Sequence, residues 1–198
     1  MGRHRSVLGR AAFGEPRGLP GRLGGLLMSW LNRSVERHAV LLADPAPRDT
    51  VLVIGFGPGV GLLAAAEAAW RGHVVGVDPS RIMVRTALAR CAERVRSGQM
   101  RLHLGTAAEL GEADDSVDIA ISVNNVHLWP DRRAGFTEVR RVLRPHGRLV
   151  LSAHRGVLGN VLDEIPDELT ACGFTSVEVD IDDRGVGGSV EIIGTRAG

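Results

Sequence analysis

Short apolar runs alternate with longer Ala- and Arg-rich segments through most of the chain after residue 48. Apolar runs of this length are typical of buried parallel strands, and the segments between them are typical of amphipathic helices. The predicted strands are residues 50–54, 73–77, 101–104, 117–123, 148–153, 174–181 and 189–195; the predicted helices are 60–70, 81–95, 107–110, 132–143 and 161–171. This order predicts βαβ units around a mainly parallel sheet.

The last two predicted strands are joined by the turn Asp182-Asp-Arg-Gly-Val-Gly-Gly188, with no helix between them. Strands joined by so tight a connection pair antiparallel. The pattern therefore predicts a three-layer α/β sandwich with a seven-stranded sheet, whose last strand is antiparallel to the others.

The N-terminal 44 residues differ from the rest of the chain. Residues 1–21 are rich in Gly and Pro, which favours a mobile arm, whereas 23–43 has apolar residues at near-helical spacing (Leu27, Leu31, Val35 and Leu42). We expect residues 1–44 to form an arm and a helical cap over the carboxyl edge of the sheet, and 45–198 to form the main domain. The basic surroundings of the helix leave a second reading open, in which it lies on an acidic membrane.

Composition narrows the classes of function. A chain of 198 residues with 44% hydrophobic content fits one domain, and its net charge of +1 argues against a dedicated nucleic-acid binder. All 24 basic residues are Arg, which excludes a lysine Schiff base or lysine general base. Cys91 and Cys172 have no CxxC spacing, so neither a disulfide framework nor a metal site is predicted. No secretory signal and no membrane span are recognisable, so we expect a cytoplasmic protein without stable membrane insertion.

The first strand leads into a glycine loop, residues 55–61, which carries Gly55, Gly57, Gly59 and Gly61. Glycines permit the tight strand-to-helix turn and allow a ligand to approach the backbone closely. A dinucleotide site needs the spacing GxGxxG, but counting from Gly55 that template requires glycine at Val60. The loop therefore has GxGxG spacing, which disfavours a nicotinamide oxidoreductase.

Asp78 ends the second strand, nineteen residues after Gly59. A carboxylate at this position of a βαβ unit can accept hydrogen bonds from the two hydroxyls of a ribose. Asp78 could instead cap the helix that starts near Arg81, although Ser80 is the better candidate for that cap. The loop and the acidic strand end together indicate a nucleoside ligand.

An ordered series of motifs between residues 48 and 155 resembles a known family. The motifs are 51–61, Val77-Asp-Pro-Ser80, Gly105-Thr-Ala-Ala-Glu-Leu110, Asp115-Ser-Val-Asp118 and Val139-Arg-Arg-Val-Leu-Arg-Pro-His-Gly147. They are similar to those of small class I S-adenosylmethionine-dependent methyltransferases of the ubiquinone and menaquinone biosynthesis type. The resemblance implies a Rossmann-like fold, S-adenosylmethionine as methyl donor and S-adenosylhomocysteine as product.

The resemblance also implies roles for particular residues. The cofactor-binding set is Gly55, Phe56, Gly57, Gly59, Asp78, Pro79, Ser80, Met83, Thr106, Ala107, Asn124 and Asn125. The loop would hold the methionine end, Asp78 the ribose, and Met83, Thr106 and Ala107 the adenine. The two asparagines would face the methionine part. On the acceptor side the resemblance implies His127, Trp129 and Trp30, the last within residues 13–32, which resemble a helix that covers the cofactor site.

Several alternatives stay open at this point. His127 could be a general base or only line the substrate site, and Trp129 could stack on an aromatic acceptor or form a loop before the next helix. The short connection 153–161 leaves no room for a substrate domain, which favours a small-molecule acceptor; an oligomer is compatible with the sequence. The family usually has acidic residues where this chain has Val53 and Thr106. These departures keep open a non-catalytic, methyltransferase-like cofactor-binding or partner protein.

Overall fold

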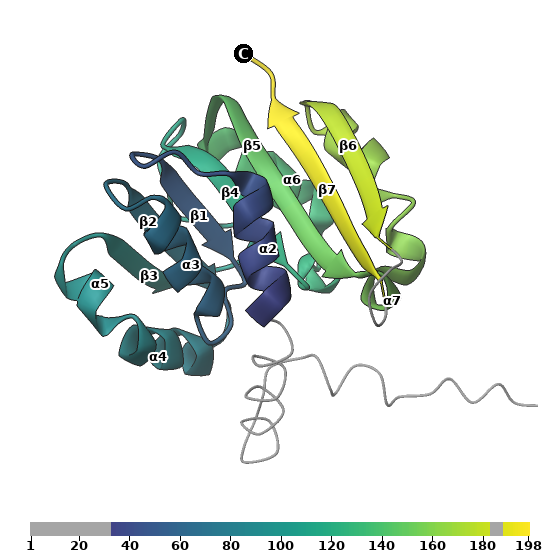
Figure 1. Cartoon of the computed structure of the whole chain (residues 1–198). Helices are drawn as coiled ribbons and strands as arrows, with labels where there is room; N and C mark the ends of the chain where they lie inside the picture. Colours follow the sequence, from purple (N-terminus) through teal and green to yellow (C-terminus); the bar gives the residue numbers. More distant parts are fainter. Residues whose placement is uncertain (1–32, 183–187) are drawn as a thin grey trace, which may run out of the picture.

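The computed structural model describes residues 33–182 and 188–198, and its centre is a seven-stranded sheet with the order β3-β2-β1-β4-β5-β7-β6 (Figure 1). The strands are β1 (Thr50–Ile54), β2 (His73–Asp78), β3 (Met100–Leu104), β4 (Val117–Val123), β5 (Leu143–His154), β6 (Phe174–Asp182) and β7 (Ser189–Arg196). Strands β1 to β5 pair in parallel, and β7 runs antiparallel to both of its neighbours, β5 and β6. The predicted fold class is confirmed.

Helices cover both faces of the sheet, so the molecule has three layers (Figure 1). One face carries α2 (Arg33–Ala43), α3 (Val60–Ala68), α4 (Arg81–Arg90) and α5 (Ala92–Arg96). The other face carries α6 (Arg132–Val142), α7 (Arg155–Leu158) and α8 (Ile165–Ala171). Two short 3-10 turns are η1 (Val126–Leu128) and η2 (Gly159–Val161). Alternate residues of β1 serve the two cores. Val51 and Val53 pack with the α2 and α3 side, and Leu52 and Ile54 with the α6 and α8 side.

Three predicted helices differ from the structure for identifiable reasons. The helix expected at 107–110 is wrong: the Leu110 N–H donates to Glu138 Oε1 (3.1 Å), and the segment is a turn closed by a bridge between Thr106 and Glu109. The helix expected at 81–95 divides at Cys91, whose buried thiol lies 3.8 Å from the Gly59 carbonyl oxygen. The helix expected at 161–171 begins only at Ile165, where proline occupies the first turn.

Helix α2 packs against α3, β4 and β5. Ala39 and Ala43 are fully buried on its inner face, and Arg148 Nη2 from β5 donates to the Ala43 carbonyl (2.7 Å). The predicted arm and the first ten residues of the predicted 23–43 helix lie outside the described residues, so the division at residue 44 stays a prediction. Within the described residues, no helix has both the length and the apolar character needed to cross a membrane.

Candidate functional site

The glycine loop connects β1 to α3 with three glycines in left-handed conformations: φ is +67° at Gly55, +53° at Gly57 and +91° at Gly59. A β-carbon on Gly55 would lie 2.5 Å from Asn125 Nδ2, whereas a β-carbon on Gly57 would meet no atom within 4 Å. The loop is therefore packed tightly on one side at Gly55 and open above Gly57. An open backbone at this place allows a ligand to approach closely.

Asp78 ends β2, directly beside the loop. Its Oδ2 accepts the Gly57 N–H (2.9 Å), its Oδ1 accepts the Ser80 N–H (2.8 Å), and the side chain is buried. Burial raises the pKa of the Asp78 carboxyl, and these two hydrogen bonds oppose the rise. Each carboxylate oxygen can accept a second hydrogen bond, so Asp78 can still accept hydrogen bonds from two ligand hydroxyl groups.

Ser80, and not Asp78, caps the N-terminus of helix α4. Ser80 Oγ accepts the Met83 N–H (3.4 Å) at the start of α4, as expected for an N-cap. Pro79 between them is exposed, and Met83 is half-buried at the start of α4. The Asp78 carboxylate thus binds the glycine loop through the Gly57 N–H, and the Ser80 hydroxyl caps the first turn of α4.

Asn125, just after β4, fastens the end of β1. Its Nδ2 donates to the Ile54 carbonyl (2.7 Å), and its Oδ1 accepts from Ser122 Oγ and from Trp129 Nε1, each at 2.8 Å. The Trp129 ring lies against Phe136, with ring centroids 5.4 Å apart. Trp129 therefore anchors the segment after β4 to the sheet, and its contact with an acceptor stays a prediction.

The same segment also caps a helix: Asp131 Oδ1 accepts the Ala134 N–H (2.9 Å) at the start of α6. Of the predicted pair at the end of β4, Asn124 has a left-handed φ of +52° and its Oδ1 accepts the His154 N–H (2.8 Å). Asn124 thereby joins the ends of β4 and β5.

His127 lies in η1 and is half-buried. Its Nδ1 is buried and has no hydrogen-bond partner among residues 33–182 and 188–198. Burial lowers the pKa of the ring below its ordinary value, which keeps the imidazole neutral at physiological pH. A neutral imidazole can accept a proton.

Hydrogen bonds bring together the loop, Asp78, Ser80 and Asn125, but they do not join every residue of the predicted set. Phe56 is buried beneath the loop, where its ring would meet a β-carbon placed on Gly76 of β2. Ala107 is buried and Thr106 is exposed at the end of β3. Trp30 lies outside the described residues.

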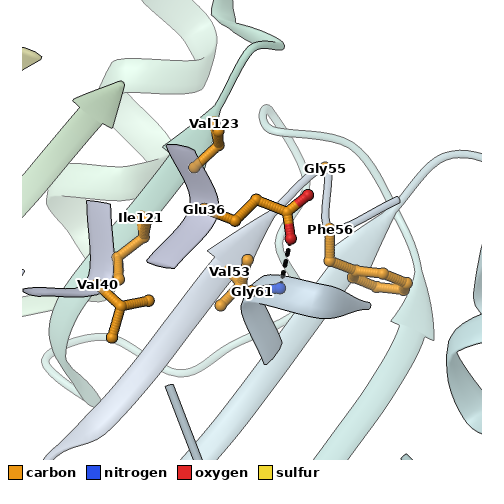
Figure 2. Close-up of a pocket in the computed structure, with 8 residues that line it drawn as sticks. All are labelled: Glu36, Val40, Val53, Gly55, Phe56, Gly61, Ile121 and Val123. Carbon is orange, nitrogen blue, oxygen red and sulfur yellow. Dashed lines mark hydrogen bonds between the residues drawn. The ribbon is translucent and has the colours of Figure 1, made fainter. Parts of the chain in front are cut away.

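Sequence reasoning missed Glu36. Figure 2 shows its carboxylate in a pocket, here called the Glu36 pocket, lined by Glu36, Val40, Val53, Gly55, Phe56, Gly61, Ile121 and Val123. Its Oε2 accepts the Gly61 N–H (2.5 Å), and burial raises the pKa of Glu36 to about 7. A signal was present in the sequence: Glu36 shares a helical face with Ala39, Val40 and Ala43, at spacings of three, four and seven residues.

Comparison with known proteins gives a consistent result. Residues 51–147 match the family model described as Methyltransferase domain. The chain is 36% identical over 141 residues to the arsenite methyltransferase of Halobacterium salinarum, covering 70% of this chain and 36% of that enzyme. It is 32% identical over 133 residues to the ubiquinone/menaquinone biosynthesis C-methyltransferase UbiE of Geotalea daltonii, covering 65% and 55%. The chain thus spans between about a third and just over half of these relatives.

Solved structures share the fold. A SAM-dependent methyltransferase from Aquifex aeolicus superposes with a TM-score of 0.69 at 17% identity, covering 80% of this chain and 88% of that one. Residues 51–147, which match the methyltransferase domain, contain the left-handed glycine loop and Asp78, to which the loop is hydrogen-bonded. The order of the strands in the sheet is consistent with this match. Residues 51–147 form a methyltransferase domain, and in sequence and fold this domain is that of a class I S-adenosylmethionine-dependent methyltransferase.

Proposed function

We propose that the protein transfers the methyl group of S-adenosylmethionine to an oxygen, nitrogen or carbon nucleophile of a small molecule. The observation that carries the proposal is the hydrogen bond from the Gly57 N–H to Asp78 Oδ2 (2.9 Å). This bond holds the open backbone at Gly57 beside the Asp78 carboxylate, whose oxygens can each accept a further hydrogen bond. The carboxylate can bind the ribose hydroxyls of a nucleoside, and the open backbone leaves space for the amino-acid group attached to it.

The residues present fit this donor. The space above Gly57 leaves room for a ligand at the loop, and Asp78 offers an acceptor for each of two ribose hydroxyls. A pyrophosphate-bearing dinucleotide fits less well, because Val60 occupies the place where GxGxxG requires glycine. The site therefore favours a nucleoside without a pyrophosphate.

When bound, S-adenosylmethionine supplies an electrophilic methyl group that passes in line to the acceptor and leaves S-adenosylhomocysteine. The protein's main contribution is orientation, since alignment of two reactants can supply much of the rate enhancement. Asp78 orients the ribose, and the bonds of Asn125 to Ile54 and Trp129 keep the ends of β1 and β4 fixed. His127, which burial keeps neutral, can take the proton that an O–H or N–H acceptor loses.

A small acceptor is supported by the connection between β5 and α8. Only the single turns α7 and η2 lie there, so no substrate domain is inserted. Of the relatives named above, one is an arsenite methyltransferase and the other a C-methyltransferase of ubiquinone/menaquinone biosynthesis, so their names favour no single acceptor for this chain.

Turnover tests the proposal. The protein is incubated with methyl-labelled S-adenosylmethionine and small phenols, quinols and amines, and each mixture is analysed for labelled product and S-adenosylhomocysteine. We expect transfer to at least one acceptor class and a marked loss with Asp78→Ala. Binding of the donor without transfer to any acceptor would favour the non-catalytic, partner-protein alternative.

A further inference from the structure

The Glu36 pocket contains a carboxylate to which the methyl-transfer chemistry described above gives no role. Glu36 Oε2 accepts the Gly61 N–H, while Oε1 has no hydrogen-bond partner within the described part of the chain. Figure 2 shows the second oxygen directed away from Gly61, with Gly55 and Phe56 on the neighbouring wall. Half of the carboxylate is thus available to a ligand.

The surroundings of this carboxylate are mainly apolar. Four aliphatic side chains line the pocket, namely Val40, Val53, Ile121 and Val123, and α3 contributes only backbone there. The charged group that acts on Glu36 is Arg90 of α4, and among the described residues it makes no ion pair with Glu36. A half-buried carboxylate among apolar side chains with no ion-pair partner in contact is costly, so a cation brought by a ligand would be bound favourably.

The pocket adjoins the glycine loop. Gly55 and Phe56 belong to the loop and line the pocket, and Gly61, which donates to Glu36, ends the loop. Under the proposed function, on which this inference rests, the amino-acid end of the donor lies at this loop. That end carries one α-ammonium group.

We propose that Glu36 is the receptor for the α-ammonium group of the methyl donor, so that helix α2 supplies a cofactor-binding residue to the site. The ammonium lies against Oε1, and Oε2 keeps its bond to Gly61. Glu36 is a binding and positioning residue: it selects ligands with an amino-acid end and takes no part in bond breaking.

The protonation of Glu36 makes binding depend on pH. Burial holds the pKa of the free protein's Glu36 at about 7, and an ammonium group beside it favours the ionised form. Arg90 of α4 is the charged group that acts on Glu36 from a neighbouring element, and the residues that α3, β1 and β4 contribute to the pocket include no titratable side chain. Binding at acidic pH therefore releases a proton from Glu36, and affinity falls as pH decreases below the pKa.

Calorimetric titration of the full chain with two ligands tests this inference. S-adenosylhomocysteine carries the amino-acid end, and 5′-methylthioadenosine has the same adenosine and sulfur without it. Glu36→Gln is compared with wild type and with Glu67→Gln, which removes an exposed carboxylate of α3. At about pH 8 we expect Glu36→Gln to weaken S-adenosylhomocysteine roughly 10- to 100-fold, the range of one charge-assisted hydrogen bond, and Glu67→Gln to change nothing.

Binding of 5′-methylthioadenosine should be the same in all three proteins. Wild type should lose roughly tenfold in affinity for S-adenosylhomocysteine between about pH 7.5 and pH 5.5, and Glu36→Gln should lose much less. Unchanged affinity in Glu36→Gln, or equal loss for both ligands, would overturn the role of Glu36 while leaving the proposed function intact. A wild-type protein that binds neither ligand would overturn the proposed function and this inference together.

Discussion

Gly55 and Asn125 are packed so closely that a single methyl group does not fit between them. A β-carbon on Gly55 would lie 2.5 Å from Asn125 Nδ2, the same atom that donates to the Ile54 carbonyl at 2.7 Å. The end of β1 and the end of β4 are thus held in one position, and the glycine loop begins from that fixed point.

The first prediction compares two glycines of this loop. Gly55→Ala adds a clash to a left-handed φ, so we expect it to lower the free energy of unfolding by about 3 kcal/mol. Gly57→Ala has a left-handed φ but open space, so about 1 kcal/mol is expected. Denaturant unfolding of the two variants measures the difference, and equal losses would contradict the packing described here.

The second prediction concerns the role of Trp129. Trp129→Phe keeps an aromatic ring against Phe136 but removes the hydrogen bond to Asn125 Oδ1. We expect a loss of about 1 kcal/mol in stability, the net value of one buried hydrogen bond, and S-adenosylhomocysteine affinity within a few-fold of wild type. Unchanged stability together with a raised KM for an identified acceptor would instead assign Trp129 to acceptor binding.

The third prediction uses the pKa of Glu36. The folded protein holds this proton up to about pH 7, whereas an ordinary glutamate loses it near pH 4.5. Between these two pH values the folded state binds more protons than the unfolded state. The contribution of protonated Glu36 to the free energy of unfolding is therefore complete below about pH 4.5 and is lost as the pH rises to about 7. Glu36→Gln removes the dependence, so without ligand it should be more stable than wild type at about pH 8, by up to about 3 kcal/mol.

Thermal unfolding of wild type, Glu36→Gln and Glu67→Gln at about pH 5 and pH 8 makes this measurement. The Glu67 variant controls for loss of a negative charge on the same side of the sheet. A Glu36→Gln protein that is less stable than wild type at about pH 8 would show that the ionised carboxylate stabilises the fold, against the burial found here.

The fold followed from local patterns, but part of the site did not. Strands β1 and β4 were predicted with their observed bounds because each is an uncharged or nearly uncharged apolar run between clear breaks. The placing of Asp78 beside the loop followed from the geometry of one βαβ unit. The 107–110 helix failed because a side chain from α6, Glu138, takes up the Leu110 N–H, a contact that local propensity does not contain.

Glu36 was missed for a similar reason. Its partner Gly61 lies 25 residues further along the chain and belongs to a different element. Val53, noted as a departure from the family's acidic position, lines the same pocket as the Glu36 carboxylate. The sequence showed that a negative charge was absent from β1, and only the packing of α2 brings another carboxylate to that place.

Calorimetric titration of S-adenosylhomocysteine into wild type and Asp78→Ala tests the central claim most directly, with Asp163→Ala, which removes an exposed aspartate between η2 and α8, as control. We expect saturable one-to-one binding to wild type and to the control, and a loss of roughly 100- to 1000-fold in Asp78→Ala, since two charge-assisted hydrogen bonds to the ribose disappear. Circular dichroism checks that the variant is folded, because Asp78 also binds the Gly57 and Ser80 N–H groups. No binding to wild type, or equal binding to folded Asp78→Ala, would contradict the account.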